Sequence, residues 1–246
     1  MSAAAGPGPA EAPAVAALKR GALGLLRHMP GRVGREAGYR LHWRGRAARA
    51  AAARARFERD LAALGPDAVC LDLGANIGEM TARMAARAGT VHAFEPDPWA
   101  FARLEARCAG MANVVLHRQA VGAAPGRVTL RRAPGFAEDP AARSLWSSVC
   151  AELAEAEQGE AIAVEQVGLA DLLRGLGQPV ALAKIDIEGA EVALLEALLD
   201  APERARIGAI YVETHEWRFP GQAPRVAALR ARAAALGQPR IDFDWV

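Results

Sequence analysis

The sequence has 246 residues, 52% of them hydrophobic and only 5% aromatic, so we expect one α/β domain with an appendage, packed largely by small side chains. No run approaches the roughly eighteen consecutive apolar residues of a membrane span, and residues 1–30 do not match a secretory signal. Cys70, Cys108 and Cys150 are too widely spaced for a disulfide framework or a metal knuckle, and a cytoplasmic protein with a net charge of only +2 is expected.

The charge is unevenly distributed along the chain. Residues 19–59 carry twelve Lys or Arg and two acids, whereas the remaining residues hold 18 basic and 26 acidic side chains. We expect a disordered tail at residues 1–13 and a basic helical arm at residues 14–65. The arm could make a peripheral contact with acidic lipid, an anionic glycan or nucleic acid. A solvated arginine-rich helix is the favoured alternative, and no specific nucleic-acid contact is expected.

The second half of the arm has the clearest helical pattern. In residues 46–65, Phe57, Leu61 and Leu64 fall at positions i, i+4 and i+7, and Gly65-Pro66 follows. The pattern predicts a helix that lies against the following domain.

From residue 66 to 246, apolar runs alternate with helical patterns. This alternation predicts an α/β fold: a three-layer, doubly wound, mostly parallel sheet with helices on both faces. Strands are predicted at 69–73, 91–95, 114–120, 181–187 and 207–213, with helices at 78–88, 97–109, 189–199 and 223–236.

Residues 122–165 interrupt this rhythm. They contain a short predicted strand at 126–132 and a loop running into a helix at 144–157. An insertion at this point of a doubly wound sheet is expected to lie over a site at the carboxyl edge.

The stretch "VCLDLGANIGEM" (69–80) predicts a ligand site at the end of the first strand. Its glycine order, Gly74-Ala-Asn76-Ile-Gly78, matches neither the P-loop nor the dinucleotide fingerprint. The carboxylate of Asp72 would repel a pyrophosphate and favour an ammonium or sulfonium group.

The second strand ends in Glu95, within "HAFEPDP". A carboxylate at this position is suited to accept hydrogen bonds from both hydroxyls of a ribose. An acid, a glycine turn and a second acid together favour S-adenosylmethionine over a dinucleotide.

The segments "LDLGANIGEMT", "AFEPDPWAFARL", "NVVLHRQAVG", "AKIDIEGAE" and "YVETHEW" occur in the order typical of FkbM-type methyltransferases, and the chain resembles that family over residues 66–219. The resemblance implies a Rossmann-like fold and methyl transfer from S-adenosylmethionine, commonly to a hydroxyl of a sugar or small metabolite. It implies a cofactor site formed by Asp72, Gly74, Asn76, Gly78 and Glu95, with Gln119 and Ala120 near the adenine and Asp186 near the methionine end.

The chain departs from this class after "YVETHEW", where one helix and only "RIDFDWV" follow. Either the sheet edge is abbreviated, or extra strands come from elsewhere, for example from residues 126–132.

Methyl transfer to an alcohol needs a base, and the candidates follow the fourth and fifth main strands. His215 is the first choice because imidazole titrates near neutral pH; Glu213 and Glu188 are the other candidates. His215 could instead be a substrate hydrogen-bond donor, and Glu188 could cap the helix that follows it.

Other side chains near these strand ends have alternative roles. Glu191 is expected to be a helix-dipole partner, and Lys184 is expected to pair with an acid. A divalent ion held by Asp186 and Glu213 is a further hypothesis.

The predicted function is therefore S-adenosylmethionine-dependent O-methylation of a saccharide or small-molecule acceptor. The alternatives are an NAD-type oxidoreductase on a similar sheet and a binding module without turnover.

Overall fold

The computed structural model describes residues 32–152 and 159–245. The predicted tail at residues 1–13 lies outside the described residues. The chain divides into two units between Ala48 and Arg49, and helix α2 (Arg32–Ala62) crosses this division. In the described part of the chain, no helix is long and apolar enough to cross a membrane.

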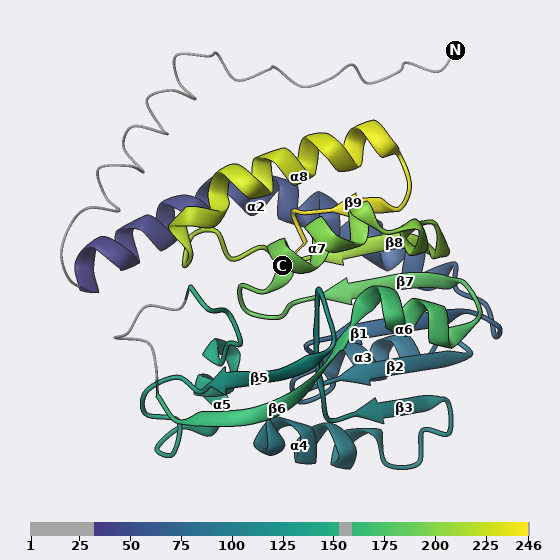
Figure 1. Cartoon of the computed structure of the whole chain (residues 1–246), viewed down its shortest axis with the longest axis horizontal. Coiled ribbons are helices and arrows are strands. Elements are labelled where there is room, and N and C mark those ends of the chain that lie inside the picture. The colour runs from purple at the N-terminus through teal and green to yellow at the C-terminus, as the bar shows by residue number, and fades with distance from the viewer. Residues whose placement is uncertain (1–31, 153–158, 246) are drawn as a thin grey trace. The chain divides into compact units, whose positions relative to one another are not determined.

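The second unit is built on a six-stranded sheet in which every pair of neighbouring strands is parallel, in the order β3-β2-β1-β7-β8-β9 (Figure 1). The chain builds outward from β1 to β3 and then returns to the other side of β1 with β7, so the strand order reverses between β1 and β7. The strands are β1 (Val69–Leu73), β2 (Thr90–Phe94), β3 (Val114–His117), β7 (Val180–Ile185), β8 (Ile207–Val212) and β9 (Arg240–Asp242).

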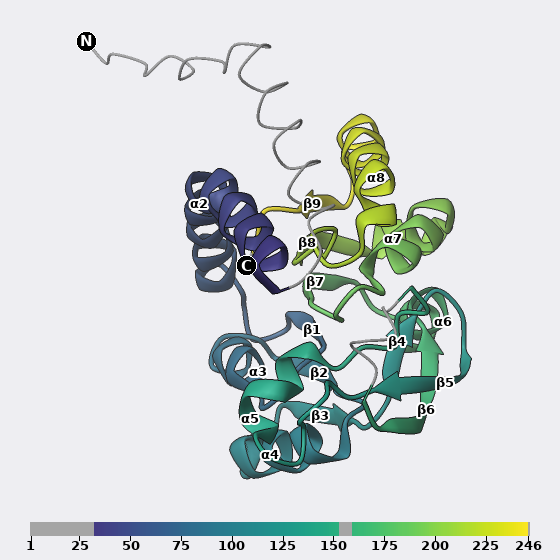
Figure 2. The same cartoon turned by 90° about the vertical axis from the view of Figure 1, so that its left-hand side faces the viewer.

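Helices cover both faces of this sheet, which gives the three-layer fold (Figures 1 and 2). One apolar cluster joins β1, β7 and β8 to α6, α7 and α8; on the opposite face, clusters join the sheet to the end of α2, α3 and α4. These helices are α3 (Glu79–Ala85), α4 (Pro98–Cys108), α6 (Leu169–Leu176), α7 (Glu191–Asp200) and α8 (Ala223–Leu236).

The end of α2 is part of this core. Phe57 and Leu61 are buried, and Leu64 just beyond the helix packs against the same cluster. Phe57 meets Tyr211 of β8 edge-on, with 5.0 Å between the ring centroids. The predicted packing of this segment against the following domain is therefore confirmed.

A second, three-stranded sheet has the order β4-β6-β5, with β4 parallel and β5 antiparallel to β6. It precedes β7 in sequence and includes most of the predicted insertion. The elements are β4 (Ala120–Gly122), β5 (Gly126–Arg131), α5 (Pro140–Arg143), the 3₁₀ turn η1 (Ser144–Trp146) and β6 (Ala161–Gly168).

The predicted fold class is confirmed, and of the two alternatives for the sheet edge the structure shows the abbreviated one. The strand at 126–132 does not supply the missing edge of the main sheet, because it pairs in the second sheet as β5. The edge is instead abbreviated to β9, which continues the parallel pattern over three residues. Two further short 3₁₀ turns precede β9 in the chain, η3 (Pro202–Arg206) and η4 (Pro220–Gln222).

The sequence patterns missed β6 and α6. Strand β6 has only two buried positions in eight, so its apolar pattern is weak.

Candidate active site

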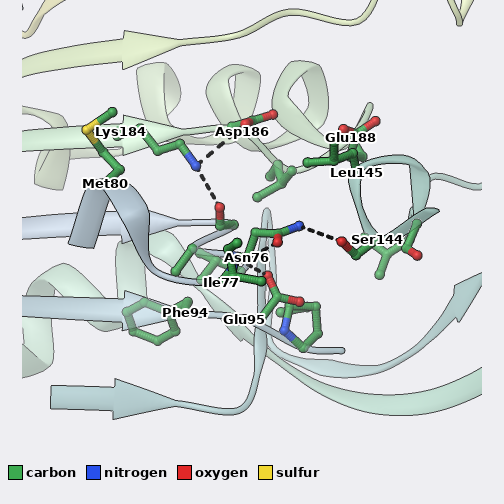
Figure 3. A pocket seen from close by; sticks show the side chains of 18 of the residues that line it. Asn76, Ile77, Met80, Phe94, Glu95, Ser144, Leu145, Lys184, Asp186 and Glu188 are labelled. Atoms are coloured by element: carbon green, nitrogen blue, oxygen red, sulfur yellow. Dashed lines mark hydrogen bonds and ion pairs between the residues drawn. The ribbon is translucent and has the colours of Figure 1, made fainter. Parts of the chain in front are cut away.

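A cavity of about 400 Å³ lies at the carboxyl ends of β1, β2 and β7, where the strand order reverses (Figure 3). Ligands of doubly wound folds bind at this position. The insertion covers it, as predicted, through Leu130, Ala141, Ser144, Leu145, Ser147 and Val149. The remaining wall comes mainly from the loops after β1, β2, β3 and β7.

The loop after β1 needs its glycines because of the protein's own packing. Gly74 has φ +80°, and a Cβ there would lie 1.8 Å from the carbonyl oxygen of Asp186; Gly78 has φ +84°, and its Cβ would meet Leu104 at 2.6 Å. Asn76 also has positive φ, at 47°. Glycine is thus required where the loop passes β7 and α4, rather than only where a ligand approaches.

The backbone amides of this loop are occupied by protein acceptors. Gly74 and Ala75 both donate to the carbonyl oxygen of Phe94, at 3.0 and 2.9 Å, and Asn76 donates to the carboxylate of Glu95 at 2.9 Å. A phosphate cradle requires amides directed at the ligand. These three amides do not form one.

Glu95 is held at the cavity wall by two backbone amides. Its Oε2 accepts from Asn76, and its Oε1 accepts from Asp97 at 2.8 Å. Each oxygen keeps a second lone pair, so the carboxylate can accept from two neighbouring hydroxyls. Burial raises the pKa of Glu95 to about 7, although both amides favour the charged form. Asp97 itself caps α4 by accepting from the amide of Trp99 at 2.7 Å.

Asp72 does not line the cavity; it lies beneath it. The carboxylate is fully buried, accepts from Thr81 at 2.6 Å and lies 3.4 Å from the ammonium of Lys184. Lys184 also donates to the carbonyl oxygen of Gly74 at 2.6 Å and lies 3.6 Å from Asp186. The predicted pairing of Lys184 with an acid is confirmed. The positive group facing Asp72 in this structure is therefore a lysine.

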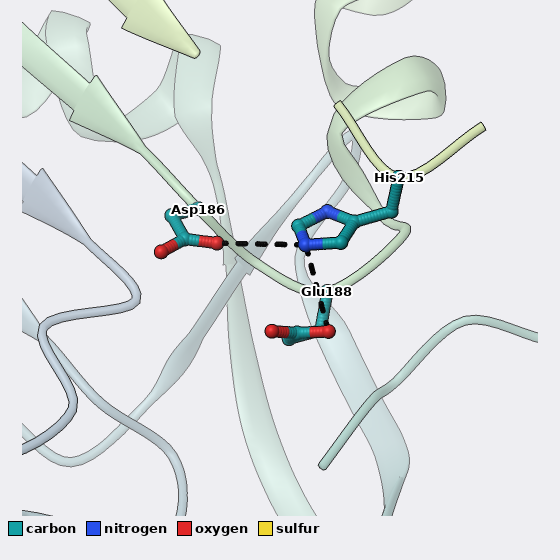
Figure 4. A group of neighbouring side chains, drawn as sticks. All are labelled: Asp186, Glu188 and His215. Carbon is teal, nitrogen blue, oxygen red and sulfur yellow. Dashed lines mark ion pairs between the residues drawn. The ribbon is translucent and has the colours of Figure 1, made fainter. Parts of the chain in front are cut away.

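At the other end of the cavity, the loops after β7 and β8 bring three side chains together (Figure 4). The Nε2 atom of His215 lies 3.9 Å from Asp186 Oδ1 and 3.6 Å from Glu188 Oε2. Asp186 and Glu188 line the cavity, whereas His215 is buried behind them. Glu188 does not cap α7, whose N-cap residue is Ala190.

The environment favours a protonated His215. Burial alone would lower its pKa, but the charges of Glu188, Glu191 and Asp186 outweigh burial and raise the pKa well above the ordinary value. Burial raises the pKa of Glu188, against the attraction of His215 and Arg218. The two groups titrate as a pair, and we place the proton on the imidazole because it faces three carboxylates.

Glu191, which the sequence analysis expects only as a helix-dipole partner, also contacts His215. It is fully buried, and its Oε1 lies 3.0 Å from Nδ1 of His215. The same carboxylate accepts from the amides of Ile187 at 2.9 Å and Gly189 at 2.9 Å. The spacing Glu188-x-x-Glu191 was visible in the sequence, but its partner stands 24 positions later.

Within the described residues, one group of side chains has the composition and spacing to hold a metal ion: Asp186, Glu188 and His215, whose ligand atoms lie within 4.8 Å of one another. The predicted ligand Glu213 is not part of this group. A divalent ion here would compete with cations already present. Arg218 donates to Glu188 at 2.9 Å, and Lys184 lies 3.6 Å from Asp186. The donor set therefore fits an ion-pair network better than a metal site.

Apolar side chains lie beside this charged end. Leu145 and Trp146 are 57% and 40% exposed, and Leu145 lines the cavity. Trp146 meets Trp217 edge-on at 5.6 Å, and its carbonyl oxygen accepts from Arg218 at 2.8 Å. Arg218 thus connects the exposed tryptophan to Glu188.

The predicted cofactor residues fall into two sets. Six line the cavity: Gly74, Asn76, Glu95, Gln119, Ala120 and Asp186. Asp72 and Gly78 lie behind the wall. Among the candidate bases, Glu188 lines the cavity and His215 contacts its wall. Glu213 is half-buried at the end of β8, and its charge acts on Lys184.

A family model described as the methyltransferase FkbM domain matches residues 72–237. Comparison with curated proteins gives no significant match. The chain is similar to a solved methyltransferase FkbM from Methylobacillus flagellatus, at 14% identity over 69% of this chain and 38% of that one, with a TM-score of 0.43.

It is also similar to an rRNA methylase from Streptococcus thermophilus, at 16% identity over 58% of this chain and 60% of that one (TM-score 0.34), and to the 23S rRNA methyltransferase ErmE, at 20% identity over 63% and 43% (TM-score 0.32). The chain thus spans 38–60% of the length of these three structures.

Proposed function

Because the chain belongs to the FkbM methyltransferase family, we propose that it transfers a methyl group from S-adenosylmethionine to a hydroxyl oxygen of a saccharide or another small molecule. The observation that carries the proposal is the cavity at the strand-order reversal. It has an anchored carboxylate at one end and a carboxylate cluster at the other.

The two ends of the cavity suit the two ends of this cofactor. We assign the ribose hydroxyls to Glu95, the adenine to the wall beside Gln119 and Ala120, and the amino-acid end to the region of Asp186. A cavity of about 400 Å³ lies within the usual range for small-molecule sites, about 300–1,000 Å³. Asp186 lines the cavity at the second end, where its carboxylate can accept from the ammonium group of the cofactor.

The NAD-type alternative is disfavoured by the loop after β1. A pyrophosphate needs backbone amides directed at it, and the amides of Gly74, Ala75 and Asn76 are occupied. The alternative of an inactive binding module shares the cofactor site and differs only in turnover.

The chemistry needs alignment and a base. The sulfonium of S-adenosylmethionine supplies an activated methyl group with a neutral thioether as the leaving group. Proximity of the acceptor oxygen to that methyl carbon supplies much of the rate. We propose the neutral form of His215 as the base, with Glu188 beside it contacting the acceptor hydroxyl. Because the pKa of His215 is raised, the fraction in this form, and with it the rate, should increase as the pH rises. We assign Glu213 an indirect role, because its negative charge stabilises the ammonium of Lys184. No step is assigned to a metal ion.

The acceptor is expected to lie between the charged end and the insertion. Leu145 and the Trp146–Trp217 pair offer apolar surface against which a sugar ring or an aromatic ring can pack. A cytoplasmic location and a peripheral contact by the basic arm stay predictions.

Two measurements test the proposal. Calorimetric titration of the full chain with S-adenosylmethionine, and separately with NAD, distinguishes the cofactor classes. Incubation with methyl-labelled S-adenosylmethionine and a panel of neutral glycosides and phenols, with glucose 6-phosphate and RNA as anionic comparisons, then follows label transfer. Binding of NAD but not of S-adenosylmethionine would contradict the proposal.

A further inference from the structure

Glu191 is built into the protein as a fixed hydrogen-bond acceptor. It begins α7, it is fully buried, and its two oxygens receive the amides of Ile187 and Gly189. Gly189 has φ +103°, and a Cβ there would lie 2.1 Å from the ring of Phe219. Since burying a carboxylate without partners is costly, these amides explain how the charge is tolerated at this position.

His215 is held from both sides of its ring. Nδ1 lies 3.0 Å from Glu191, so this nitrogen carries the proton in the neutral imidazole and donates it to the carboxylate. The backbone of His215 is also fixed, because its carbonyl oxygen accepts from the amides of Arg218 and Phe219 at 2.9 and 3.0 Å. Nε2 is left facing Asp186 and Glu188 at the cavity wall.

We propose that Glu191 is a positioning residue for the base: in the neutral form of His215 it holds the proton on Nδ1 and leaves the lone pair on Nε2 for the acceptor hydroxyl. This inference rests on the proposed methyl transfer. In that step the acceptor oxygen forms a bond to the methyl carbon while the carbon–sulfur bond breaks. The bonding pair goes to sulfur, which becomes a neutral thioether. The hydroxyl proton goes to Nε2, and the imidazolium that forms lies among carboxylates.

The charged groups around the imidazole agree with this assignment. Asp186 and Glu188 face Nε2 from the loop after β7, and Glu191 faces Nδ1 from α7. Arg218 contacts Glu188, and Lys184 lies near Asp186, so each of these two acids has a second cationic partner. Glu191 is the acid in direct hydrogen-bond contact with the ring. It therefore sets both the ring orientation and the tautomer, in addition to stabilising the charge.

The test needs no acceptor. Full-length protein labelled with nitrogen-15 at its five histidines is titrated by NMR, with and without S-adenosylhomocysteine, and His215→Gln identifies the signal. In the wild type, His215 should titrate above the ordinary histidine pKa, and its neutral form should carry the proton on Nδ1. Glu191→Gln should lower the pKa of His215 by about one pH unit or more and lose the single tautomer. Glu191→Asp should restore part of both.

Two controls separate positioning from general charge or folding effects. Glu188→Gln should lower the pKa of His215 but keep the Nδ1–H tautomer, because the bond to Glu191 remains. Glu196→Gln, on the same helix and paired with Arg225, should change neither property. Thermal melting of each variant establishes that it is folded.

An unchanged tautomer and pKa in a folded Glu191→Gln variant would overturn the inference, as would a neutral wild-type His215 that carries its proton on Nε2. Selective broadening of the His215 signal by micromolar Mn²⁺ would overturn it too, by assigning Nε2 to a metal. Failure of S-adenosylhomocysteine to bind would contradict the proposed function separately, since the titration of the ligand-free protein still reports on Glu191.

Discussion

The two ends of the cavity are built by different means. The end formed by the loops after β1 and β2 is shaped mainly by the backbone: two amides hold Glu95, and positive φ angles form the turn. At the end formed by the loops after β7 and β8, side-chain charges hold one another, with His215 among three acids. The first arrangement suits rigid recognition of a ligand, and the second suits movement of a proton.

The difference also predicts how each end responds to mutation. Removing one charge from the second end changes the protonation of its neighbours, because they are coupled. Changing the first end alters fit and affinity while leaving the chemistry of the other end in place. The following variants, from the largest expected effect to the smallest, test this division.

Replacing His215 with asparagine should lower the rate of methyl transfer by about 10²–10⁴-fold, because the general base is lost. The affinity for S-adenosylmethionine should change little. Single-turnover kinetics and calorimetry measure the two quantities. His92→Asn is a matched control, since His92 stacks on His117 outside the cavity. Full turnover by the His215 variant would remove this residue as the base.

Replacing Lys184 with methionine should reduce the free energy of unfolding by about 3–5 kcal/mol, because it leaves the buried carboxylate of Asp72 without its cation. Arg127→Met, which breaks an exposed pair with Glu165, should cost about 0–1 kcal/mol. Urea unfolding measures both. Equal losses of stability in the two variants would show that the Asp72–Lys184 pair beneath the cavity does not stabilise the fold.

Gly74→Ala should destabilise the protein by about 2–4 kcal/mol, since the new Cβ would meet the carbonyl of Asp186 in a left-handed backbone conformation. Gly175→Ala is the opposite case: it lies in α6 with open space around its Cβ position, and the change should stabilise by up to about 1 kcal/mol. Thermal melting distinguishes them, and a neutral Gly74→Ala would contradict the close packing of this loop against β7.

The raised pKa of Glu95 predicts a pH-dependent affinity. The carboxylate must be charged to accept two ribose hydroxyls, so affinity for S-adenosylmethionine should rise about tenfold from pH 6 to pH 8 as a group with pKa about 7 ionises. Glu95→Gln should remove that component of the pH profile. A wild-type profile identical to that of the variant would exclude Glu95 from the binding site.

The same pKa has an effect of opposite direction on folding. Because the pKa is raised by burial, the stability associated with protonated Glu95 is fully present below its unfolded value and is lost as pH rises through about 7. Unfolding free energies of wild type and Glu95→Gln across this range test the sign.

Sequence patterns predicted the main sheet and the first end of the cavity because those signals are local. Asn76 and Glu95 follow two successive strands, and parallel strands bring their carboxyl ends together. The burial of Asp72 beneath the cavity could not be predicted, because it depends on an ion pair with Lys184 of β7, which is distant in the sequence. Glu191 lies in the first turn of α7, as its expected helix-dipole role requires, but its contact with His215 could not be predicted, because His215 stands 24 positions later in the sequence.

The central claim is that this cavity binds S-adenosylmethionine with its ribose on Glu95, and calorimetric titration of wild type and Glu95→Gln at pH 8 tests it most directly. We predict a single site in the wild type and an affinity about 10–100-fold weaker in the variant, the loss expected for hydrogen bonds to a charged group. Glu165→Gln, on the exposed face of β6, should bind like the wild type. No binding by the wild type, or equal affinity in the Glu95 variant, would contradict the account.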